Sequence, residues 1–292
     1  MNWDETIKYI QKMPQYDKLV RNSYLEHDLV LNIQRFEQSA EYAETISIIQ
    51  EFYPKGAQLL DVGSGNGISA FAFARTGYQV TALEPDISHV AGVGAIRKIM
   101  DETGLKNIKV YQTTLEQNNI ESNKFDVVYA RQAMHHANNL KEFVAQAARL
   151  LKPGGIIFTA RDHVVFNNRD KKRFLASHPL QKYYGGENAF SPTEYRGAFL
   201  SAGLKIIKEL KFFDSVINYF PLSQNDINNR ELDVIASRRL SLEKKIGLLS
   251  RVLLIFKLYN YFLNIKMGNW KGEKSYSGRM YSYVCIKPEV IS

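Results

Sequence analysis

The first residues that could do chemistry form a glycine-dense turn, GSGNG at residues 63–67, directly after the apolar run at residues 58–62. Glycine tolerates positive φ and has no side chain, so such a turn can pass close beneath a cofactor at a helix N-terminus. A second apolar run, residues 79–83, ends at Glu84, which lies 21 residues after Gly63. An acid at this distance, at the tip of the second strand, is placed to bind the hydroxyls of a nucleotide ribose. The spacing predicts a cofactor site, and the alternative is a packing turn followed by an ordinary strand-end acid.

Histidines form the second group of residues with chemical potential. His135 and His136 follow the expected fourth strand, and Asp162 and His163 follow the expected fifth strand at the rim of the site. Histidine is the side chain best suited to move protons near neutral pH. We therefore predict three catalytic candidates: His163 and His136 as possible bases, and Asp162 as a carboxylate that could orient a base. Histidines that only pack or cap would give the same pattern.

The elements that must position these residues alternate along the chain from residue 58. Central strands of a parallel sheet are covered on both faces, so they read as apolar runs without strict alternation. Pro153-Gly154-Gly155 ends one helix and begins the next strand. The alternation predicts an α/β fold with a doubly wound, mostly parallel, Rossmann-like sheet of seven strands, preceded by N-terminal helices. The expected strands are 58–62, 79–83, 108–112, 125–130, 155–160, 204–213 and 279–287, and the expected helices between them are 67–76, 88–103, 139–151 and 192–202.

Four motifs resemble the class I S-adenosylmethionine (SAM)-dependent methyltransferases, in the branch of bacterial small-molecule enzymes. They are LLDVGSGNG at 59–67, TALEPD at 81–86, FDVVYARQAMHH at 125–136 and LLKPGGIIFTARDH at 150–163, in the family's order and spacing. A later segment, GENAFSPTEYRGAFLSAGLKII at 186–207, is similar to methyltransferases found near bacterial polysaccharide genes. The resemblance implies SAM as the methyl donor and a last strand that runs antiparallel beside its predecessor.

The resemblance also implies a set of cofactor-binding residues. The turn at Gly63 would lie under the methionine part of SAM, with Asp61 organising it, and Glu84 would accept hydrogen bonds from both ribose hydroxyls. Thr114 would face the adenine, where the family usually has an aspartate, which is a stronger acceptor. Arg131 would meet a carboxylate of cofactor or substrate, unless it is a solvated strand-end arginine. The full expected set is Asp61, Gly63, Ser64, Gly65, Gly67, Glu84, Pro85, Asp86, Thr114, Leu115, Ala130 and Arg131.

A polar and aromatic segment downstream of the fifth strand has a composition that suits hydrogen bonding to a sugar or polyol. Aromatic packing alone would give a similar composition. The candidate substrate residues in this segment are His178, Tyr183, Tyr184, Glu187 and Asn188.

The sequence argues against a metal site and against a nucleic-acid substrate. His135 and His136 lack a nearby cysteine or carboxylate cluster at ligand spacing, so we expect no metal. The Asn/Asp-Pro-Pro-Tyr signature of amino-directed DNA methyltransferases and a Pro-Cys nucleophile are both absent. The single cysteine, Cys285, cannot form an internal disulfide and is expected to be an inert core residue.

The connection before the last strand is too long for a structureless loop. It runs from about residue 214 to residue 277, so we expect helices that form a lid, a partner surface or both. The predicted organisation is a helical N-terminal lid at 1–55, a SAM-binding core at 56–213, the helical insertion at 214–277, and the final strand and tail at 278–292.

The insertion holds most of the excess positive charge. The 292 residues carry a formal net charge of +8, and residues 236–274 contain nine basic and two acidic side chains. Residues 246–265 are mostly apolar with a narrow polar face, and their charges argue against a spanning helix. A basic amphipathic helix could make peripheral contact with an anionic membrane, whereas packing against its own fold or in a homodimer is the alternative. With one cysteine and a polar N-terminus, we expect a cytoplasmic protein that could bind peripherally at the inner face of the membrane.

Taken together, these features predict a SAM-dependent methyltransferase that acts on a small-molecule acceptor. The leading acceptor is a hydroxyl of a sugar or lipid-linked saccharide, methylated by direct in-line displacement that yields S-adenosylhomocysteine. One alternative is a non-catalytic subunit that holds SAM or a partner without turnover. Another is a nicotinamide oxidoreductase, which GSGNG disfavours because it departs from the G-x-G-x-x-G spacing.

Overall fold

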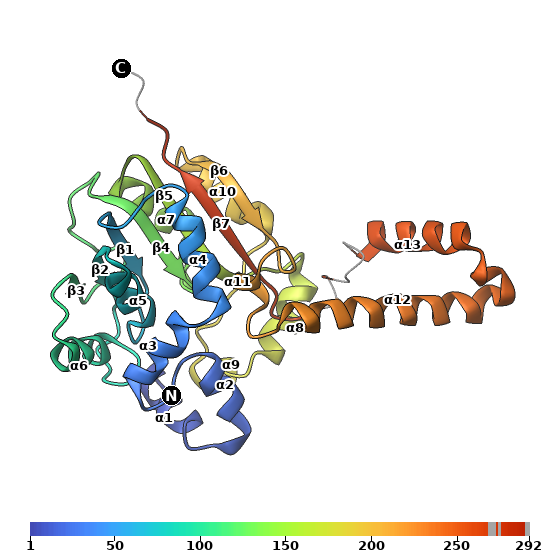
Figure 1. The fold of residues 1–292 in the computed structure, drawn as a ribbon, viewed down its shortest axis with the longest axis horizontal. Coiled ribbons are helices and arrows are strands. Elements are labelled where there is room, and N and C mark those ends of the chain that lie inside the picture. The colour runs from blue at the N-terminus through green and yellow to red at the C-terminus, as the bar shows by residue number, and fades with distance from the viewer. Residues whose placement is uncertain (268–272, 274–275, 290–292) are drawn as a thin grey trace.

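Seven strands form one sheet in the part of the chain that the computed structural model describes, residues 1–267, 273 and 276–289 (Figure 1). The strands are β1 Gln58–Val62, β2 Gln79–Leu83, β3 Ile108–Tyr111, β4 Phe125–Arg131, β5 Leu151–His163, β6 Lys205–Leu210 and β7 Met280–Ile286. Their order is β3-β2-β1-β4-β5-β7-β6. Neighbours from β3 to β5 are parallel, and β7 is antiparallel to both β5 and β6. The predicted mostly parallel sheet and its antiparallel last strand are confirmed.

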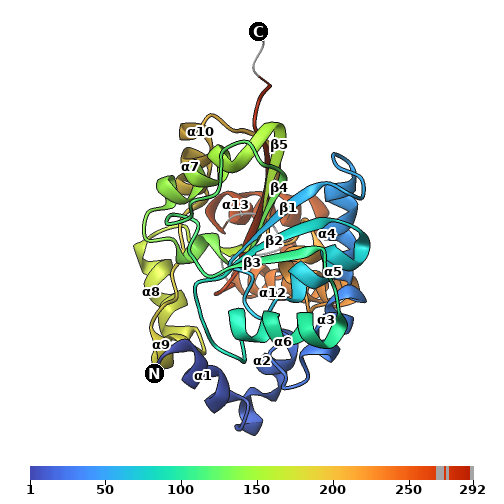
Figure 2. The same cartoon turned by 90° about the vertical axis from the view of Figure 1, so that its left-hand side faces the viewer.

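Helices cover both faces of this sheet (Figure 2). In chain order, the helices before β6 are α1 Trp3–Ile10, α2 Asp17–Asn22, α3 Leu29–Glu37, α4 Ala40–Gln50, α5 Ile68–Thr76, α6 Val93–Thr103, α7 Leu140–Leu150, α8 Asn168–Ser177, α9 Gln181–Tyr184 and α10 Pro192–Ser201. Helices α7 and α10 pack on one face, and α3 to α6 pack on the other. Both faces of the central strands are therefore buried, as their apolar sequences predict.

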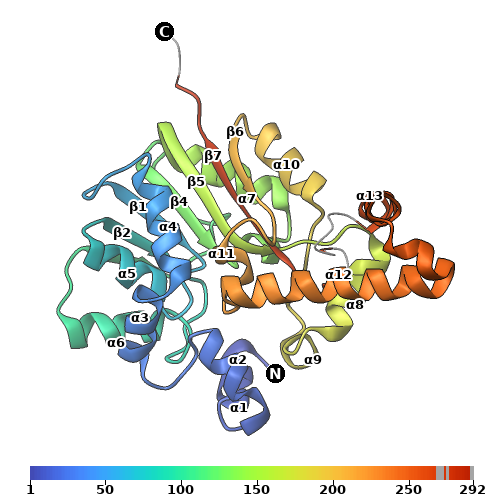
Figure 3. The same cartoon turned by 45° about the vertical axis from the view of Figure 1, so that its right-hand side comes forward.

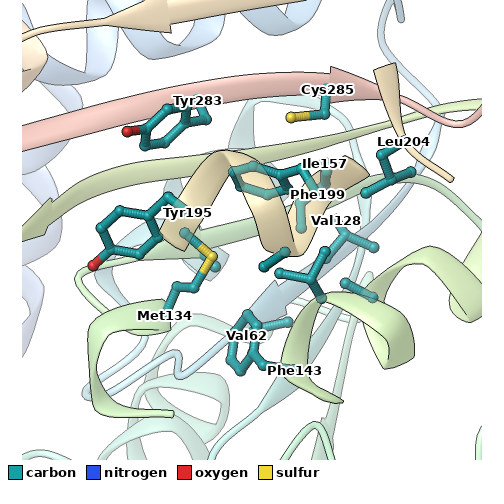
Figure 4. Close-up of a cluster of buried hydrophobic side chains, with 14 of the residues drawn as sticks. Val62, Val128, Met134, Phe143, Ile157, Tyr195, Phe199, Leu204, Tyr283 and Cys285 are labelled. Atoms are coloured by element: carbon teal, nitrogen blue, oxygen red, sulfur yellow. The ribbon is translucent and has the colours of Figure 1, made fainter. Parts of the chain in front are cut away.

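The core on the α7 and α10 side anchors the end of the sheet that carries β7 (Figure 4). Phe143 of α7 and Tyr195 and Phe199 of α10 are buried with Tyr283 and Cys285 of β7 in this cluster. Fully burying a large apolar side chain contributes about 1.5–3 kcal/mol. Burial also raises the pKa of the Cys285 thiol, so this residue is an unreactive core residue as predicted.

Strand β5 is longer than the predicted 155–160, and this changes the position of two candidate catalytic residues. Asp162 pairs with Tyr281 of β7, and His163 pairs with Met280. Both residues therefore lie inside the sheet and are buried, not at the rim of the site as predicted. The antiparallel partner β7 extends the strand, and local sequence patterns do not reveal such a partner.

Helix α6 begins at Val93, five residues later than predicted. The Oε1 of Glu84 accepts the Asp86 N–H at 2.9 Å, and the Oδ1 of Asp86 accepts the Ser88 N–H at 2.6 Å. A Cβ at Gly92 would lie 2.3 Å from the carbonyl oxygen of Asp86, so the chain packs tightly on itself here. These contacts hold residues 84–92 in a turn beside the glycine turn and delay the helix.

The N-terminal 55 residues are helical, but their helices have two different positions. Helices α3 and α4 pack into the core with Phe36, Tyr42 and Ile49. Helix α1 lies next to α9, where Trp3 and Tyr184 pack with ring centroids 4.9 Å apart (Figure 2). Only the first part of the predicted lid is therefore placed where it could cover a site.

The insertion forms a helical hairpin that projects away from the sheet (Figures 1 and 3). It follows the short helix α11 Val216–Tyr219 and contains α12 Gln224–Ile246, a 3-10 helix Gly247–Arg251 (η3) and α13 Leu253–Met267. The predicted single helix over 246–265 is interrupted, because Gly247 adopts a φ of 57° at the end of α12. Residues 268–272 and 274–275 lie outside the described part. None of the described helices has the length and apolar composition needed to cross a bilayer.

Candidate active site

A cavity of about 580 Å³ opens at the carboxyl ends of β1, β2 and β4. Strand β1 lies between β2 and β4, so the direction in which successive strands are added to the sheet reverses beside it. Open α/β sheets bind ligands at such a switch point. The volume falls within the range of small-molecule sites. The lining residues used below are Trp3, Gly63, Gly65, Glu84, Pro85, Asp86, Thr114, Leu115, Ala133, His136, Phe143 and Tyr184.

The glycine turn forms one wall of the cavity with its main chain. Gly63 and Gly65 have φ values of 66° and 57°, a backbone conformation that residues other than glycine rarely adopt. A Cβ on Gly63 would lie 2.8 Å from the Cβ of Ala133, which is too close for carbon atoms. At Gly65 a Cβ would meet nothing within 4 Å, so this glycine leaves the wall of the cavity open to a ligand.

Glu84 closes the turn from the end of β2. Its Oε2 accepts the Gly65 N–H at 2.7 Å, and its Oε1 accepts the Asp86 N–H at 2.9 Å. Burial raises the pKa of Glu84 to about 7, although these two N–H groups act to lower it. As a carboxylate, Glu84 keeps lone pairs that can accept further hydrogen bonds from a ligand.

The predicted cofactor residues divide into those on the cavity wall and those behind it. The Oδ2 of Asp61 accepts the Ser69 hydroxyl at 2.7 Å, and the Ser64 hydroxyl donates to the main-chain oxygen of Asp61 at 2.8 Å. Burial raises the pKa of Asp61 to about 7. These contacts support the turn without reaching the cavity. On the wall are Gly63, Gly65, Glu84, Pro85, Asp86, Thr114 and Leu115, and behind it are Asp61, Ser64, Gly67, Ala130 and Arg131.

Arg131 does not reach the cavity, contrary to the prediction that it meets a ligand carboxylate. Its Nε and Nη2 donate to the carboxylate of Glu41 in α4 at 2.6 and 3.1 Å, and Arg161 lies 3.5 Å from the same carboxylate. Burial alone would raise the pKa of Glu41, but the two guanidinium groups hold it below its ordinary value. Arg131 is therefore part of a buried ion cluster that joins α4 to β4 and β5.

His136 lies on the wall of the cavity. Its Nδ1 is 2.9 Å from the carbonyl oxygen of Gly186. A carbonyl can only accept, so Nδ1 carries the proton and Nε2 keeps its lone pair. Trp3 and Tyr184 form an aromatic wall of the same cavity. His136 thus combines access to the cavity with a nitrogen that can accept a proton.

The other two catalytic candidates lie in a buried cluster behind His136. His163 is only 7% exposed, and Asp162 is fully buried. The Oδ1 of Asp162 accepts the Nδ1–H of His135 at 2.9 Å and the His135 backbone N–H at 3.0 Å, so it orients His135 and not the adjacent His163. Burial lowers the pKa of His163 to about 3. The structure places His136, and not His163, beside the cavity.

The predicted substrate residues do not form one surface. Tyr184 is the one that lines the cavity, as far as the described residues show. The Tyr183 hydroxyl is 2.7 Å from that of Tyr16, and the Asn188 side chain accepts a hydrogen bond from its neighbouring backbone N–H. His178 and Glu187 face each other, with Nδ1 and Oε1 3.6 Å apart, in the cluster that contains His163.

Several residues of the site were not identified from the sequence. Trp3 reaches the cavity from α1, and Ala133 and Phe143 reach it from the region after β4. Glu41 and His135 have roles that depend on partners far along the chain. No local pattern marks these residues, although an aromatic residue in the expected lid was a weak signal for Trp3.

A glycine turn after the first strand, facing an acid at the end of the second, defines a Rossmann-like enzyme with a nucleotide-type cofactor. Residues 60–159 match a family model described as a methyltransferase domain. The chain is 30% identical over 180 residues to the ubiquinone biosynthesis O-methyltransferase of Rickettsia canadensis (strain McKiel), covering 58% of this chain and 71% of that protein. It is 25% identical over 184 residues to the enzyme of that name from Brucella ovis, and the match covers 62% of this chain and 71% of that protein.

A solved structure of phosphoethanolamine N-methyltransferase 2 from Haemonchus contortus, in complex with phosphomonomethylethanolamine and S-adenosylhomocysteine, has a similar fold. The TM-score is 0.54 at 14% identity, covering 97% of this chain and 61% of that one, so the likeness concerns the fold alone. The chain belongs to the class I SAM-dependent methyltransferases. The predicted family and enzyme class are confirmed, and the nicotinamide oxidoreductase alternative is set aside.

Proposed function

We propose that this methyltransferase transfers the methyl group of SAM to a hydroxyl oxygen of a small acceptor, with His136 as the base. The observation that carries the proposal is that His136 shares one cavity with Gly63, Gly65 and Glu84 and holds its Nδ1 proton on the Gly186 carbonyl. The acceptor oxygen attacks the methyl carbon, and the carbon–sulfur bond breaks with its electron pair left on sulfur. The hydroxyl proton passes to Nε2 of His136, and S-adenosylhomocysteine is the second product.

The glycine turn and Glu84 would hold SAM in this arrangement. The open space above Gly65 would admit the methionine part, and Glu84 would accept the ribose hydroxyls. Thr114 and Leu115 line the same cavity and would contact the adenine. Holding the sulfonium and the acceptor in line supplies much of the rate enhancement in such a transfer.

The acceptor would lie between His136 and the aromatic wall of Trp3 and Tyr184. The relatives are named as O-methyltransferases of ubiquinone biosynthesis, which supports an oxygen acceptor. A ring packed against Trp3 and Tyr184 could belong to a phenol or to a sugar, since both present an apolar face. The hydroxyl of a sugar or lipid-linked saccharide remains the acceptor proposed from the sequence, and phenolic hydroxyls are the competitors that the relatives' names suggest.

The test is methyl transfer from isotopically labelled SAM to a panel of phenolic and saccharide hydroxyl compounds, followed by mass spectrometry. We expect one acceptor class to give a methyl ether together with S-adenosylhomocysteine. His136→Ala should lower turnover by about 10²–10⁴-fold, the usual contribution of a positioned base. The affinity for SAM should change little, because His136 would contact the acceptor and not the cofactor.

His27→Ala is the matched control, since His27 is an exposed histidine that does not line the cavity. It should keep wild-type turnover and SAM affinity. Equal turnover in His136→Ala and wild type would remove His136 as the base. Methyl transfer to amine compounds tested beside this panel, with none to hydroxyls, would overturn the oxygen acceptor.

A further inference from the structure

A buried cluster of possible ligands lies behind the cavity wall and takes no part in the proposed methyl transfer. It contains His135 of the 3-10 helix Met134–His136 (η2), His163 at the end of β5, and Glu187 in the loop after α9. One ligand atom of each lies within 4.8 Å of the others. The Nε2 of His135 and the Oε2 of Glu187 are 3.8 Å apart. Three segments distant in sequence therefore bring two imidazoles and a carboxylate together.

Asp162 orients His135 in the way that metal-ligating histidines are usually oriented. Its Oδ1 accepts the Nδ1–H of His135 at 2.9 Å and the backbone N–H at 3.0 Å. With Nδ1 assigned as the donor to this carboxylate, the lone pair is on Nε2, the nitrogen that lies next to Glu187. A carboxylate partner of this kind fixes the tautomer and increases the basicity of the metal ligand.

The other histidines of the cluster have nitrogen atoms without a hydrogen-bond partner. The Nδ1 of His163, on a residue that is 7% exposed, has no partner among the described residues, and neither has the Nδ1 of His178. The His178 nitrogen lies 3.6 Å from the Oε1 of Glu187. A buried polar atom left unpaired costs about 1–3 kcal/mol, so these nitrogens indicate a missing partner.

The charge of Glu187 points in the same direction. Its side chain is 6% exposed, and in the described part of the chain its carboxylate oxygens lie within 4 Å of the ring nitrogens of His135 and His178. A metal ion bound by His135 and Glu187 would place a positive charge beside this buried side chain.

We propose that His135, His163 and Glu187 hold one divalent transition-metal ion. Imidazole and carboxylate ligands in this number suit Zn²⁺, and they also bind Co²⁺ and Fe²⁺. Zinc distances of about 2.0–2.2 Å require the ligand atoms to close to about 3.3–3.6 Å of one another. The ligand atoms of these three residues, which lie within 4.8 Å of one another, would therefore have to approach by roughly 1 Å.

The three ligands come from segments that are distant in sequence, so the ion would cross-link them. The ion would fasten the loop of Glu187, and with it α9, to the carboxyl ends of β4 and β5. Tyr184 at the end of α9 lines the cavity, so the metal would steady the acceptor side of the active site. This role is independent of which hydroxyl the enzyme methylates.

The test uses protein stripped with a chelator, dialysed, and titrated with Zn²⁺ or Co²⁺ alone. Wild type should retain one metal per chain after gel filtration, and Co²⁺ should give the visible absorption bands of a four-coordinate N and O site. Zn²⁺ should raise the melting temperature of the stripped protein, because it binds the folded state. Glu187→Gln should bind at least 100-fold more weakly, and Asp162→Asn about 10–100-fold more weakly, as expected for loss of an orienting partner.

His27→Ala is again the control, since it removes an exposed histidine and should bind metal as wild type does. Circular dichroism of every stripped variant distinguishes loss of a ligand from loss of the fold. Wild type that binds neither ion at equimolar, micromolar concentrations would overturn the proposal without any variant. If the Glu187→Gln variant keeps its full metal content, the ion binds elsewhere in the protein, and this result would also overturn the proposal. Neither result bears on methyl transfer, which is measured separately.

Discussion

At the scale of single residues, Glu84 is a buried acid whose charge changes near neutral pH. Its pKa is raised to about 7 by burial, and its two oxygens hold the Gly65 and Asp86 N–H groups. Above this pKa the carboxylate can accept the ribose hydroxyls of SAM. Below it, the protonated acid loses one acceptor and its negative charge, so the cofactor site weakens as the pH falls.

We therefore expect the affinity of the wild-type protein for S-adenosylhomocysteine to fall about tenfold from pH 8 to pH 6, measured by calorimetry. This is the ratio of ionised Glu84 at the two pH values for a pKa of about 7. Glu84→Gln should bind weakly and with a nearly flat pH profile. Glu116→Gln, which changes another cavity-lining carboxylate, is the control and should keep the wild-type profile. A pH-dependent Glu84→Gln variant would show that another group controls binding.

At the scale of elements, the α12–α13 hairpin exposes an apolar and basic surface that its own fold does not cover. The exposed fractions of eight large apolar side chains at its tip run from 48% to 72%, so the alternative of packing against the core is wrong for these residues. Phe256 and Leu242 are buried between the two helices, and Arg239 lies over the Phe256 ring at 5.0 Å. The exposed apolar residues at the hairpin tip are Leu248, Leu249, Val252, Leu253, Leu254, Leu258, Tyr261 and Phe262.

We propose that an anionic membrane surface covers this hairpin tip. Exposed cations lie among the apolar residues, and each basic side chain near an anionic lipid surface contributes about 1 kcal/mol. A second copy of the chain would instead bring two sets of positive charges together. The exposed cations are Lys244, Lys245, Arg251 and Lys257. Lys271 and Lys274, which were counted in the predicted basic surface, lie outside the described residues.

Flotation with vesicles tests this surface. Wild type should float with vesicles that contain phosphatidylglycerol at low salt, less so at high salt, and not with pure phosphatidylcholine. Leu253→Glu with Leu254→Glu should abolish flotation, and Leu200→Glu, which changes an exposed leucine of α10, should not. No flotation at low salt, or a stable dimer that the Leu253/Leu254 variant converts to monomer, would assign the surface to something other than lipid.

At the scale of the whole molecule, Glu41 joins the N-terminal helices to the centre of the sheet. It is fully buried and pairs with Arg131 of β4 and Arg161 of β5. Arg161 also donates to the carbonyl oxygens of Ile217 and Phe220 at 2.6 and 3.0 Å, which places the start of the insertion. One carboxylate thus fixes the relative positions of α4, the sheet and α11.

Glu41→Ala should lower the free energy of unfolding by about 3–5 kcal/mol, because it leaves buried guanidinium groups without their counter-charge. Urea denaturation followed by circular dichroism measures the change. Glu37→Ala is the matched control: Glu37 pairs with Arg75 at 3.1 Å on the partly exposed face of α3, and such pairs contribute about 1 kcal/mol or less. Equal losses of unfolding free energy in the two variants would contradict a stabilising role for the buried Glu41 ion cluster.

The sequence alone determined the elements of the fold and the cofactor side of the site. Strands β1 and β2, the glycine turn and Glu84 are where the motifs predict them, because each depends on residues close together along the chain. A strand, a turn and a helix start follow from local apolar pattern and glycine conformation. The acid at the end of β2 follows from the fixed length of one strand–helix–strand unit.

Only the tertiary structure decided which polar side chains meet. His135, His163 and Glu187 come together because the sheet places β4 beside β5 and because the loop after α9 contacts the segment after β4. Asp162 orients His135 and not its neighbour His163, since adjacent strand residues point to opposite faces. The Arg131 side chain likewise pairs with Glu41 of α4 and does not face the cavity. Contacts of this kind depend on strand order and on packing across the core, and neither property is encoded in local spacing.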